Sequence, residues 1–374
     1  MHILFAGGGT AGHINPALAV ADYIVSKHPN AKISYIGTER GLESRLVRAA
    51  GYDFYPIEVA GFQRKISFEN IKRNVAAVKM MLTSSIEAKK ILKNIKPDVV
   101  VGTGGYVSGP VLREAAKLKI RTCIHEQNAF PGITTKALAS MVDTVMLAMP
   151  EAEKYLKCKN KPVVTGNPVR NSMTLVDKKG AKQQLGTGDK PVILSFGGSL
   201  GARPINEAVA GLIAHYAESD KYYHLHATGK RGYEDTLNLL KEKGIDVSKH
   251  SNVEIREYID NMDVCMAAAD IVICRSGAIT LSELQNCGKP SVLIPSPYVA
   301  ENHQFHNAMT LKKAGAAEVI EEKDLTVERL VKTVSYMVDN KSALEKMSEN
   351  AKKTAILDSN ARIYEIIMKL FTVA

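Results

Sequence analysis

The stretch His2-Ile3-Leu4-Phe5-Ala6-Gly7-Gly8-Gly9-Thr10-Ala11-Gly12-His13 decides the fold of the first half of the chain. Its apolar run, residues 3–6, predicts a buried strand, and its glycines predict a tight turn. Asn15-Pro16 then predicts the start of a helix, because Asn caps helix N-termini and Pro is tolerated at the first helical position. Strand, glycine turn and helix in this order are typical of a Rossmann-like unit.

The same pattern begins again 190 residues later, where Ile193-Leu194-Ser195-Phe196-Gly197-Gly198 repeats the order seen at residues 3–8 and a helix opens at Pro204. Apolar strands alternate with helical stretches along both halves, which indicates βαβ units and parallel sheets. The other strands are expected at 32–36, 98–101, 121–125, 142–147, 222–227, 252–256, 270–274 and 290–294. We therefore predict an α/β fold with two Rossmann-like domains facing a cleft, where ligands of open α/β sheets bind.

The boundary between the two domains is expected near Gly166-Asn167-Pro168, because Asn-Pro interrupts regular structure. This gives a first domain over 1–165 and a second over 166–356. A last helix at about 357–374 could belong to either domain and is expected to pack back on the first.

Composition narrows the class of protein. The chain has 374 residues, 45% of them hydrophobic, which is ordinary for a globular protein with two cores. Its five cysteines are scattered without C-x-x-C spacing, so neither a disulfide framework nor a zinc site is predicted, and a reducing compartment fits best. No D-x-D triplet occurs, and we expect no metal and no cofactor.

The N-terminus lacks the features of a signal peptide, and the longest uncharged apolar stretch, 99–112, is too short to span a bilayer.

The net charge of +10 lies wholly in the first half. Residues 1–165 hold 23 Lys and Arg against 13 Asp and Glu, whereas residues 166–374 hold 26 of each sign. This asymmetry indicates an anionic partner for the first half, such as nucleic acid, a membrane surface or a phosphorylated substrate, although a merely basic surface would look the same. The absence of Trp and an aromatic content of 6% leave little for base stacking, so nucleic acid is disfavoured.

Three loops of the first half could carry chemistry. Gly7, Gly9 and Gly12 fit G-x-G-x-x-G, which alone is a weak phosphate-binding signal, and Glu39 keeps a nicotinamide dinucleotide open as an alternative. His13 is a candidate general base, unless it is a loop histidine satisfied by the backbone. The other two loops are the glycine-rich segment 102–109, with Gly104, Gly105 and Tyr106, and His125-Glu126-Gln127-Asn128, in which Glu126 could be the base instead of His13.

The second half offers two candidate groups. Glu283, on the helix that follows Arg275-Ser276-Gly277-Ala278, could accept hydrogen bonds from both hydroxyls of a ribose, or could simply favour an early helical turn. The segment 300–307 is rich in amide and imidazole groups, a composition suited to sugar hydroxyls. Arg275 and Arg170 are candidate cations for a leaving diphosphate.

A candidate membrane-binding helix covers residues 68–82, between the first two glycine-rich loops of the first half. Its apolar side chains fall within an arc of roughly 80° at 100° per residue, and lysines border the arc, as in helices that lie on anionic lipid. A helix facing the core would show the same pattern. The residues concerned are Phe68, Ile71, Lys72, Val75, Lys79 and Leu82.

Taken in order, these motifs resemble the MurG family of bacterial N-acetylglucosaminyltransferases. The resemblance rests on the loops at 7–13, 104–106, 125–128, 166–170, 197–203 and 275–283 and extends from residue 3 to about 320. Ala11, where a glycine is common, and His303, where a glutamine can occur before Gln304, depart from the family pattern.

The resemblance implies a GT-B type fold and an inverting transfer of N-acetylglucosamine (GlcNAc) from UDP-GlcNAc to undecaprenyl-pyrophosphoryl-MurNAc-pentapeptide, giving a β-1,4 linkage. It implies a lipid acceptor and an anionic membrane surface as partners of the first domain, and UDP-GlcNAc as the ligand of the second. It also implies a peripheral enzyme on the cytoplasmic side of the cell membrane.

Carried over by position, the resemblance gives individual roles to residues. Ser199 would meet the diphosphate, Glu283 the ribose, and Ile259 the uracil, with Arg170 beside it. Ala278 and Gln304 would touch the sugar, and His13 and Asn128 would lie on the acceptor side. Thr10, Gly12 and Asn128 complete the residues expected around UDP-GlcNAc, and Gly9, Gly104, Gly105 and Tyr106 form the acceptor and diphosphate loops.

Three alternatives remain open from the sequence. One is another lipid-acceptor nucleotide-sugar transferase, such as a diacylglycerol glycosyltransferase. A second is a nicotinamide-dependent dehydrogenase, raised by the first glycine loop. The third is a non-catalytic membrane-binding module that uses the basic half.

Overall fold

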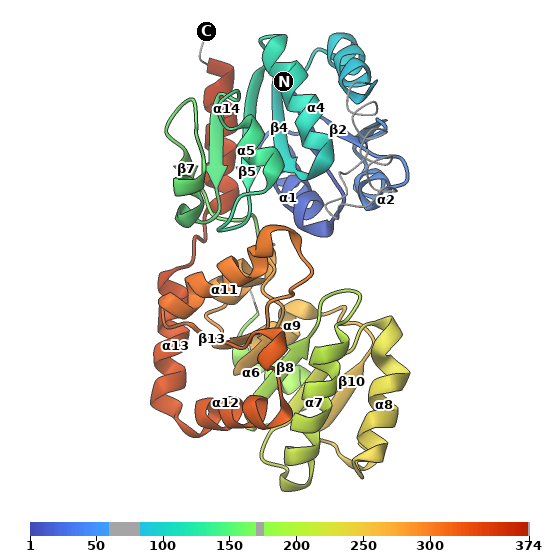
Figure 1. Cartoon of the computed structure of the whole chain (residues 1–374), viewed down its shortest axis with the longest axis vertical. Helices are drawn as coiled ribbons and strands as arrows, with labels where there is room; N and C mark the ends of the chain where they lie inside the picture. Colours follow the sequence, from blue (N-terminus) through green and yellow to red (C-terminus); the bar gives the residue numbers. More distant parts are fainter. Residues whose placement is uncertain (60–82, 170–175, 373–374) are drawn as a thin grey trace. The chain divides into compact units, whose positions relative to one another are not determined.

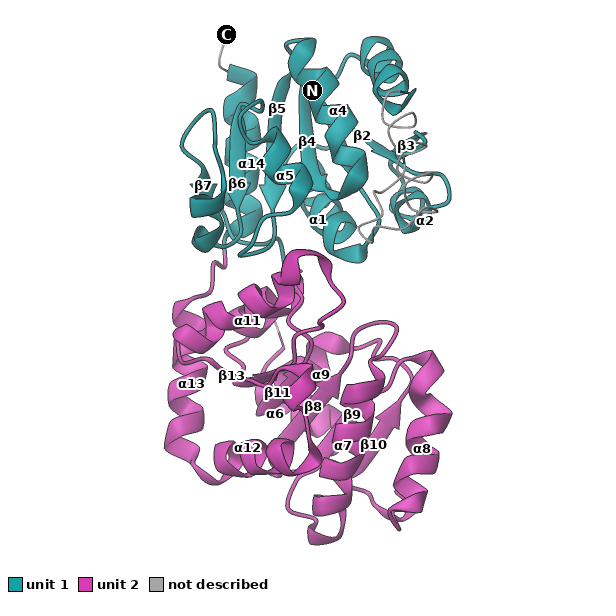
Figure 2. Ribbon diagram, viewed as in Figure 1, with its two compact units in different colours: residues 1–169, 358–374 teal, residues 170–357 magenta. Residues whose placement is uncertain are grey.

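The computed structural model describes residues 1–59, 83–169 and 176–372, and these residues form two compact units. Unit 1 contains residues 1–169 and 358–374, and unit 2 contains residues 170–357 (Figure 2). The division therefore falls a few residues after the expected position of 165/166, and the last helix is part of unit 1.

Unit 1 is a parallel sheet with helices on both faces (Figure 1). The strands in spatial order are β3 (Asp53–Pro56), β2 (Lys32–Gly37), β1 (His2–Gly7), β4 (Val99–Gly104), β5 (Arg121–Glu126), β6 (Thr144–Leu147) and β7 (Val163–Val164). The helices include α1 (Ala11–Lys27), α2 (Leu42–Ala49), α4 (Gly105–Lys117), α5 (Ile133–Leu138), the 3₁₀ helix η1 (Pro150–Tyr155) and α14 (Ser359–Thr372), and residues 83–95 are also helical.

The core of unit 1 has two layers because successive side chains of a strand point to opposite faces. In β1, Ile3 and Phe5 belong to the layer that also holds α1 and α14, whereas Leu4 and Ala6 belong to the layer that holds α4. All six residues of β4 are buried, as expected for a central parallel strand covered on both faces.

The start of α1 differs from the sequence prediction. The helix begins at Ala11, with Thr10 as its N-cap residue, and Pro16 lies inside it. Asn15-Pro16 therefore does not open the helix, and the prediction was wrong. The glycine turn leads directly into the helix, and Pro16 lies in its second turn, where the missing N–H leaves out the backbone hydrogen bond to Gly12.

Unit 2 repeats the architecture with a second parallel sheet. Its strands in spatial order are β10 (Val253–Arg256), β9 (Tyr223–Ala227), β8 (Val192–Phe196), β11 (Ile271–Cys274), β12 (Ser291–Leu293) and β13 (Ala317–Val319). Its α-helices are α6 (Lys178–Leu185), α7 (Arg203–Tyr216), α8 (Tyr233–Glu242), α9 (Met262–Ala268), α10 (Ala278–Asn286), α11 (His303–Lys313), α12 (Val327–Asp339) and α13 (Lys341–Lys353). Short 3₁₀ turns include η4 (Lys230–Gly232), η6 (Ala300–Asn302) and η7 (Glu322–Asp324).

Each expected strand is present, and three strands were not predicted: β3, β7 and β13. These are edge strands with two to four residues. Over the described ranges, we find no helix with the length and apolar character needed to cross a bilayer.

Candidate active site

In unit 1, the loops that follow β1, β4 and β5 meet at one edge of the sheet. The three strands are parallel neighbours, so their carboxyl ends lie side by side. The first and second loops touch, since a Cβ on Gly105 would clash with the backbone of Gly8. Gly105 has a φ of +77°, and glycine alone satisfies both this conformation and the close approach. The structure thus brings His13, Gly104 and Gln127 together.

His13 lies on the first turns of α1 and its ring lies against Gly104. A Cβ built on Gly104 would come within 2.8 Å of Nδ1, so only a glycine leaves room for the imidazole. On the same side of the ring, Nδ1 is 3.1 Å from Oε1 of Gln127. The ring is half-buried and is held by one of its two nitrogens.

Glu126, the other candidate base, has its carboxylate committed to the loop that follows β5. The residue is buried, and Oε1 accepts from the backbone N–H of Asn128 at 3.0 Å and from the Asn128 side-chain amide at 3.1 Å. Oε2 accepts from the N–H of Gly132 at 3.0 Å. Such a carboxylate organises the 127–132 turn, because its lone pairs are used by fixed donors.

The remaining predicted residues of unit 1 are distributed over the same three loops. Gly9, with a φ of +86°, and Thr10 are exposed at the first loop, and Gly12 lies on the first turn of α1. Tyr106, on the first turn of α4, is 55% exposed, so its side chain is accessible to a ligand.

Glu43 holds the first glycine loop and was not predicted from the sequence. Its carboxylate lies on the first turn of α2, is fully buried, and accepts from the N–H of Gly9 at 3.2 Å and from the N–H of Thr38 at 3.0 Å. The Thr38 hydroxyl donates to it at 2.6 Å. Burial acts to raise the pKa of Glu43, but these hydrogen bonds outweigh it and lower the pKa. Glu39, the candidate for a nicotinamide ribose, instead forms an exposed ion pair with Arg48 at 2.9 Å.

In unit 2, the predicted donor residues also fall at one edge of a sheet. Ser199 lies in the exposed loop between β8 and α7, and Ile259 is buried in the loop between β10 and α9. Ala278 is the first residue of α10, and the half-buried Glu283 lies on the second turn of the same helix. Since β8, β9, β10 and β11 are parallel neighbours, these loops and helix starts share the carboxyl edge.

Gln304 and Arg275 organise the loop that follows β12. Oε1 of Gln304 accepts from the N–H of Ser296 at 2.9 Å. Arg275 donates to the carbonyls of Ile294 at 3.1 Å and Pro295 at 3.2 Å and pairs with the partly buried Glu322. Arg275 is therefore engaged with the protein, and its consideration as a cation for a leaving diphosphate finds no support in this geometry.

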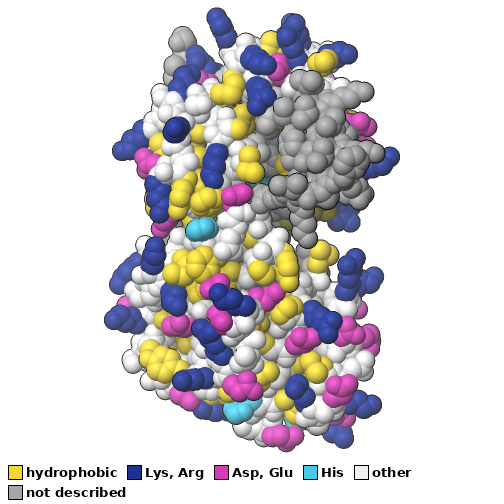
Figure 3. Space-filling model, viewed as in Figure 1, with side chains coloured by type: hydrophobic (Ala, Val, Ile, Leu, Met, Phe, Trp, Pro, Cys, Tyr) yellow, Lys and Arg dark blue, Asp and Glu magenta, His cyan; other side chains and the backbone are white. Residues whose placement is uncertain are grey.

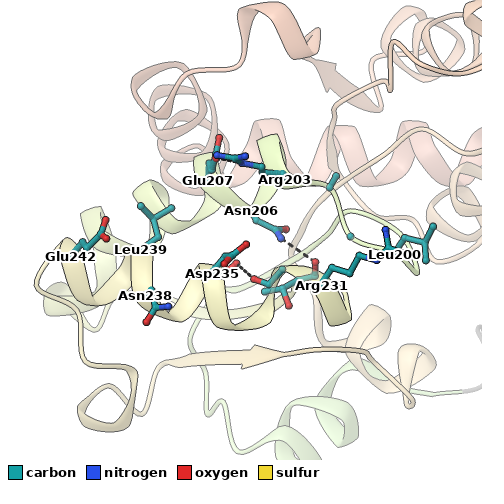
Figure 4. A pocket seen from close by; sticks show the side chains of 14 residues that line it. Leu200, Arg203, Asn206, Glu207, Arg231, Asp235, Asn238, Leu239 and Glu242 are labelled. Atoms are coloured by element: carbon teal, nitrogen blue, oxygen red, sulfur yellow. Dashed lines mark hydrogen bonds and ion pairs between the residues drawn. The ribbon is translucent and has the colours of Figure 1, made fainter.

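A pocket of about 680 Å³ lies between α7 and α8 in unit 2 (Figure 4). Leu200 and Gly201 of the glycine loop form one end, and acidic and basic side chains, including Arg203, Asp235 and Glu242, form much of the wall. The pocket adjoins the loop of Ser199, but Ser199, Ile259, Ala278, Glu283 and Gln304 do not line it.

Some predicted residues lie outside the described residues. These are Arg170 and the stripe Phe68, Ile71, Lys72, Val75, Lys79 and Leu82. Among the residues that the structure does describe, no group of three or more His, Cys, Asp or Glu side chains is placed to hold a metal ion.

Comparison with known proteins identifies the family of the chain. Residues 3–147 match the glycosyltransferase family 28 N-terminal domain, and residues 192–363 match the C-terminal domain of the same family. The chain is 47% identical over 368 residues to a protein of Acetivibrio thermocellus named UDP-N-acetylglucosamine–N-acetylmuramyl-(pentapeptide) pyrophosphoryl-undecaprenol N-acetylglucosamine transferase, covering 98% of this chain and 97% of that protein. A protein of the same name from Ruminiclostridium cellulolyticum is 45% identical, with 99% of this chain and all of the relative covered.

Among solved structures, the crystal structure of Acinetobacter baumannii MurG is similar with a TM-score of 0.79 and 28% identity, covering 98% of this chain and 99% of that one. Both units are thus Rossmann-like, as in GT-B glycosyltransferases. These matches confirm the resemblance carried by the glycine loops, and the chain belongs to glycosyltransferase family 28.

Proposed function

We propose that this protein transfers GlcNAc from UDP-GlcNAc to the C4 hydroxyl of undecaprenyl-pyrophosphoryl-MurNAc-pentapeptide, the reaction that completes the disaccharide unit of peptidoglycan. The observation that carries the proposal is identity of 45–47% over nearly the full length of relatives that bear the name of this transferase. The glycine loops at the carboxyl edges of both sheets support it, since backbone amides at such loops suit phosphate oxygens.

The reaction is a single displacement with inversion. The acceptor oxygen forms a bond to the anomeric carbon while the bond from that carbon to the β-phosphate oxygen breaks, and UDP leaves with the electron pair. The proton of the acceptor hydroxyl must pass to a base. No covalent intermediate on the protein is needed.

His13 is the base in this proposal. Its Nδ1 is held by Gln127, which leaves Nε2 to accept a proton, whereas both oxygens of Glu126 accept hydrogen bonds from Asn128 and Gly132. Glu126 thereby shapes the turn that carries Asn128, which we assign to the acceptor side of the site.

Unit 2 supplies the donor site in this proposal. Ser199 and the amides of its loop receive the diphosphate, and Glu283 receives the ribose hydroxyls. Ile259 contacts uracil through its backbone, with Arg170 beside it, and Ala278 and Gln304 face the sugar. Thr10, Gly12 and Asn128 of unit 1 complete the contacts with UDP-GlcNAc, and Gly9, Gly104, Gly105 and Tyr106 line the acceptor diphosphate.

We further propose that the protein works as a peripheral enzyme at the cytoplasmic face of the cell membrane, and so contributes to cell shape and division. A lipid-linked acceptor lies in a membrane, so an enzyme that uses it works at a membrane surface. In the visible face of unit 1, Lys and Arg predominate over Asp and Glu, whereas both signs are mixed on unit 2 (Figure 3). A basic surface attracts anionic lipid. The 68–82 stripe is the proposed contact.

The proposal is tested by incubating the protein with UDP-GlcNAc and the lipid-linked muramyl-peptide acceptor and measuring UDP release. We expect release that depends on this acceptor and is absent with diacylglycerol; release with diacylglycerol alone would overturn the choice of acceptor.

The assignment of the base is tested with two variants. His13→Gln should lower kcat by about 10²–10⁴-fold. If Glu126→Gln lowered kcat as much while His13→Gln did not, the assignment of the base would be wrong.

A further inference from the structure

A continuous chain of polar contacts runs from the carbonyl of Gly166 to the imidazole of His13. His125 Nε2 is 2.9 Å from the Gly166 oxygen, His125 Nδ1 is 3.1 Å from Nε2 of Gln127, and Gln127 Oε1 is 3.1 Å from Nδ1 of His13. Gln127 and His125 are both almost fully buried. Along this chain, the partners of each side chain determine which of its atoms donates a hydrogen and which accepts one.

The orientation of the Gln127 amide is fixed by its partners. Nε2 is 2.9 Å from the carbonyl oxygen of Thr103 and 3.1 Å from the carbonyl oxygen of His125. A carbonyl can only accept, so the nitrogen of the amide, and not its oxygen, must occupy this position. The amide oxygen therefore faces His13 and can only accept from it.

The protons of His125 agree with this orientation. Its Nε2 faces a carbonyl oxygen and must carry a hydrogen, and its Nδ1 faces the Gln127 amide nitrogen and must accept. Burial lowers the pKa of His125 and keeps the ring neutral, as this pattern requires. The Gln127 backbone is held as well, because its carbonyl accepts from the Asn167 side chain at 3.2 Å.

We propose that Gln127 is a positioning residue that fixes His13 as the Nδ1–H tautomer. The hydrogen on Nδ1 is donated to Gln127 Oε1, so Nε2 carries the lone pair. The ring edge that includes Nδ1 lies against Gly104, which leaves the Nε2 edge as the one available to a substrate hydroxyl. This inference rests on the proposed function only for the identity of the proton that Nε2 accepts; the tautomer itself follows from the contacts.

The tautomer matters because a neutral imidazole accepts a proton only at its unprotonated nitrogen. If His13 carried its hydrogen on Nε2, the nitrogen facing the substrate would be a donor, and the lone pair would point at Gln127. A buried amide anchored by Thr103 and His125 holds the ring in the reactive form without adding a charge. Gln127 would thus act through His13, with no contact to the substrate.

The test compares the full-length protein with Gln127→Met, which keeps the approximate size of the side chain but neither accepts strongly nor donates. Histidine ¹⁵N labelling and long-range ¹H–¹⁵N spectra at a pH where His13 is neutral report which nitrogen carries the hydrogen. His13→Gln identifies the His13 signals among those of the ten histidines. Gln184→Met makes the same change at an exposed position on α6 and serves as the control.

We expect the hydrogen of His13 on Nδ1 in the wild type, and partly or wholly on Nε2 in Gln127→Met. In the transferase assay, Gln127→Met should lower kcat by about 10- to 100-fold with KM for UDP-GlcNAc little changed, and Gln184→Met should match the wild type. A wild-type hydrogen on Nε2, or unchanged tautomer and kcat in Gln127→Met, would overturn the inference.

A second variant keeps the proposal testable if Gln127→Met does not fold. Gln127→Glu keeps an acceptor for Nδ1–H but cannot donate to the Thr103 carbonyl while ionised. Gln127→Glu should retain the Nδ1–H tautomer of His13. If circular dichroism showed Gln127→Met to be unfolded, a loss of the Nδ1–H tautomer in Gln127→Glu would still count against the proposal. If the wild type showed the Nδ1–H tautomer but no transfer with the muramyl-peptide acceptor, the proposed function would fall and the tautomer assignment would stand.

Discussion

Glu43 connects two loops of unit 1 through a single buried carboxylate. It accepts from the backbone of Gly9 and from both the backbone and the hydroxyl of Thr38, and its oxygens also lie close to Gly8, where a Cβ would come within 2.5 Å. The glycine at position 8 is therefore required by the space that the carboxylate occupies. The loop that carries Thr10 and leads to His13 is shaped by a residue from another helix.

Replacing Glu43 with Gln should destabilise unit 1 by about 1–3 kcal/mol, because an amide places donors where backbone N–H groups also donate. Urea unfolding followed by circular dichroism measures the change. Glu39→Gln is the matched control: its carboxylate is 54% exposed and paired with Arg48 at the surface, so we expect almost no change in the free energy of unfolding. Equal effects of the two variants would show that the Glu43 contacts add nothing to stability.

In unit 2, strands β8 and β9 bury a cluster of one serine and two histidines. The Ser195 hydroxyl is 2.8 Å from Nε2 of His224 and 2.8 Å from Nδ1 of His226. Burial lowers the pKa of His224 to about 3 and that of His226 to about 4. Both rings are thus neutral in the folded protein at physiological pH.

Because of these two histidines, we predict that lowering the pH destabilises the part of unit 2 in which β8 and β9 pack together. Unfolded histidines bind protons below a pH of about 6.5, while the folded pair does not until pH about 4 or below, so the free energy of unfolding must fall as the pH is lowered through this window. At pH values well below 6.5 and above 4, the slope that the two groups together contribute approaches about 2.7 kcal/mol per pH unit.

Hydrogen exchange of a peptide covering Tyr223–Ala227, measured between pH 7 and pH 5, reports the opening free energy of β9. His224→Gln should remove about half of the slope that the pair contributes. His28→Gln, at an exposed position in unit 1, should leave the slope of β9 unchanged. An identical slope in wild type and His224→Gln would contradict the assignment to this pair.

The chain returns to its first unit at its end. Helix α14 packs on α1 and on strands β4 and β5, with Ile363 and Ile367 fully buried. Its Tyr364 packs edge-on against Tyr23 at 5.7 Å and has its hydroxyl 2.8 Å from Nε2 of His28. The last helix therefore completes the core layer that contains β1, although all of unit 2 lies between the two elements in the sequence.

Ile367→Ala should destabilise unit 1 by about 2–5 kcal/mol, because it leaves a cavity among buried side chains. Hydrogen exchange should become faster in α1 and remain unchanged in β8 of unit 2. The exposed Glu365 on the same helix gives the control, since Glu365→Ala removes no buried contact. Equal acceleration in both units would mean that α14 stabilises more than the unit it packs against.

Local patterns in the sequence were sufficient for the central strands, the glycine loops and the repetition of the Rossmann-like unit. They failed at the edges: β3 and β7 are short and half-exposed, so they lack the apolar run by which a buried strand is recognised. The start of α1 was misplaced because the Asn15-Pro16 signal is also compatible with the second turn of a helix.

The sequence by itself determined the fold class and the loops in which a site can lie, because strand periodicity and glycine spacing act over a few neighbouring residues. Only the tertiary structure decided which side chains act together. His13 and Gln127 are 114 positions apart, and Gly9 and Glu43 are 34 apart. Hydrogen bonds between such residues depend on the order of strands in the sheet, which brings their loops to the same edge, and this order is a property of the folded chain as a whole.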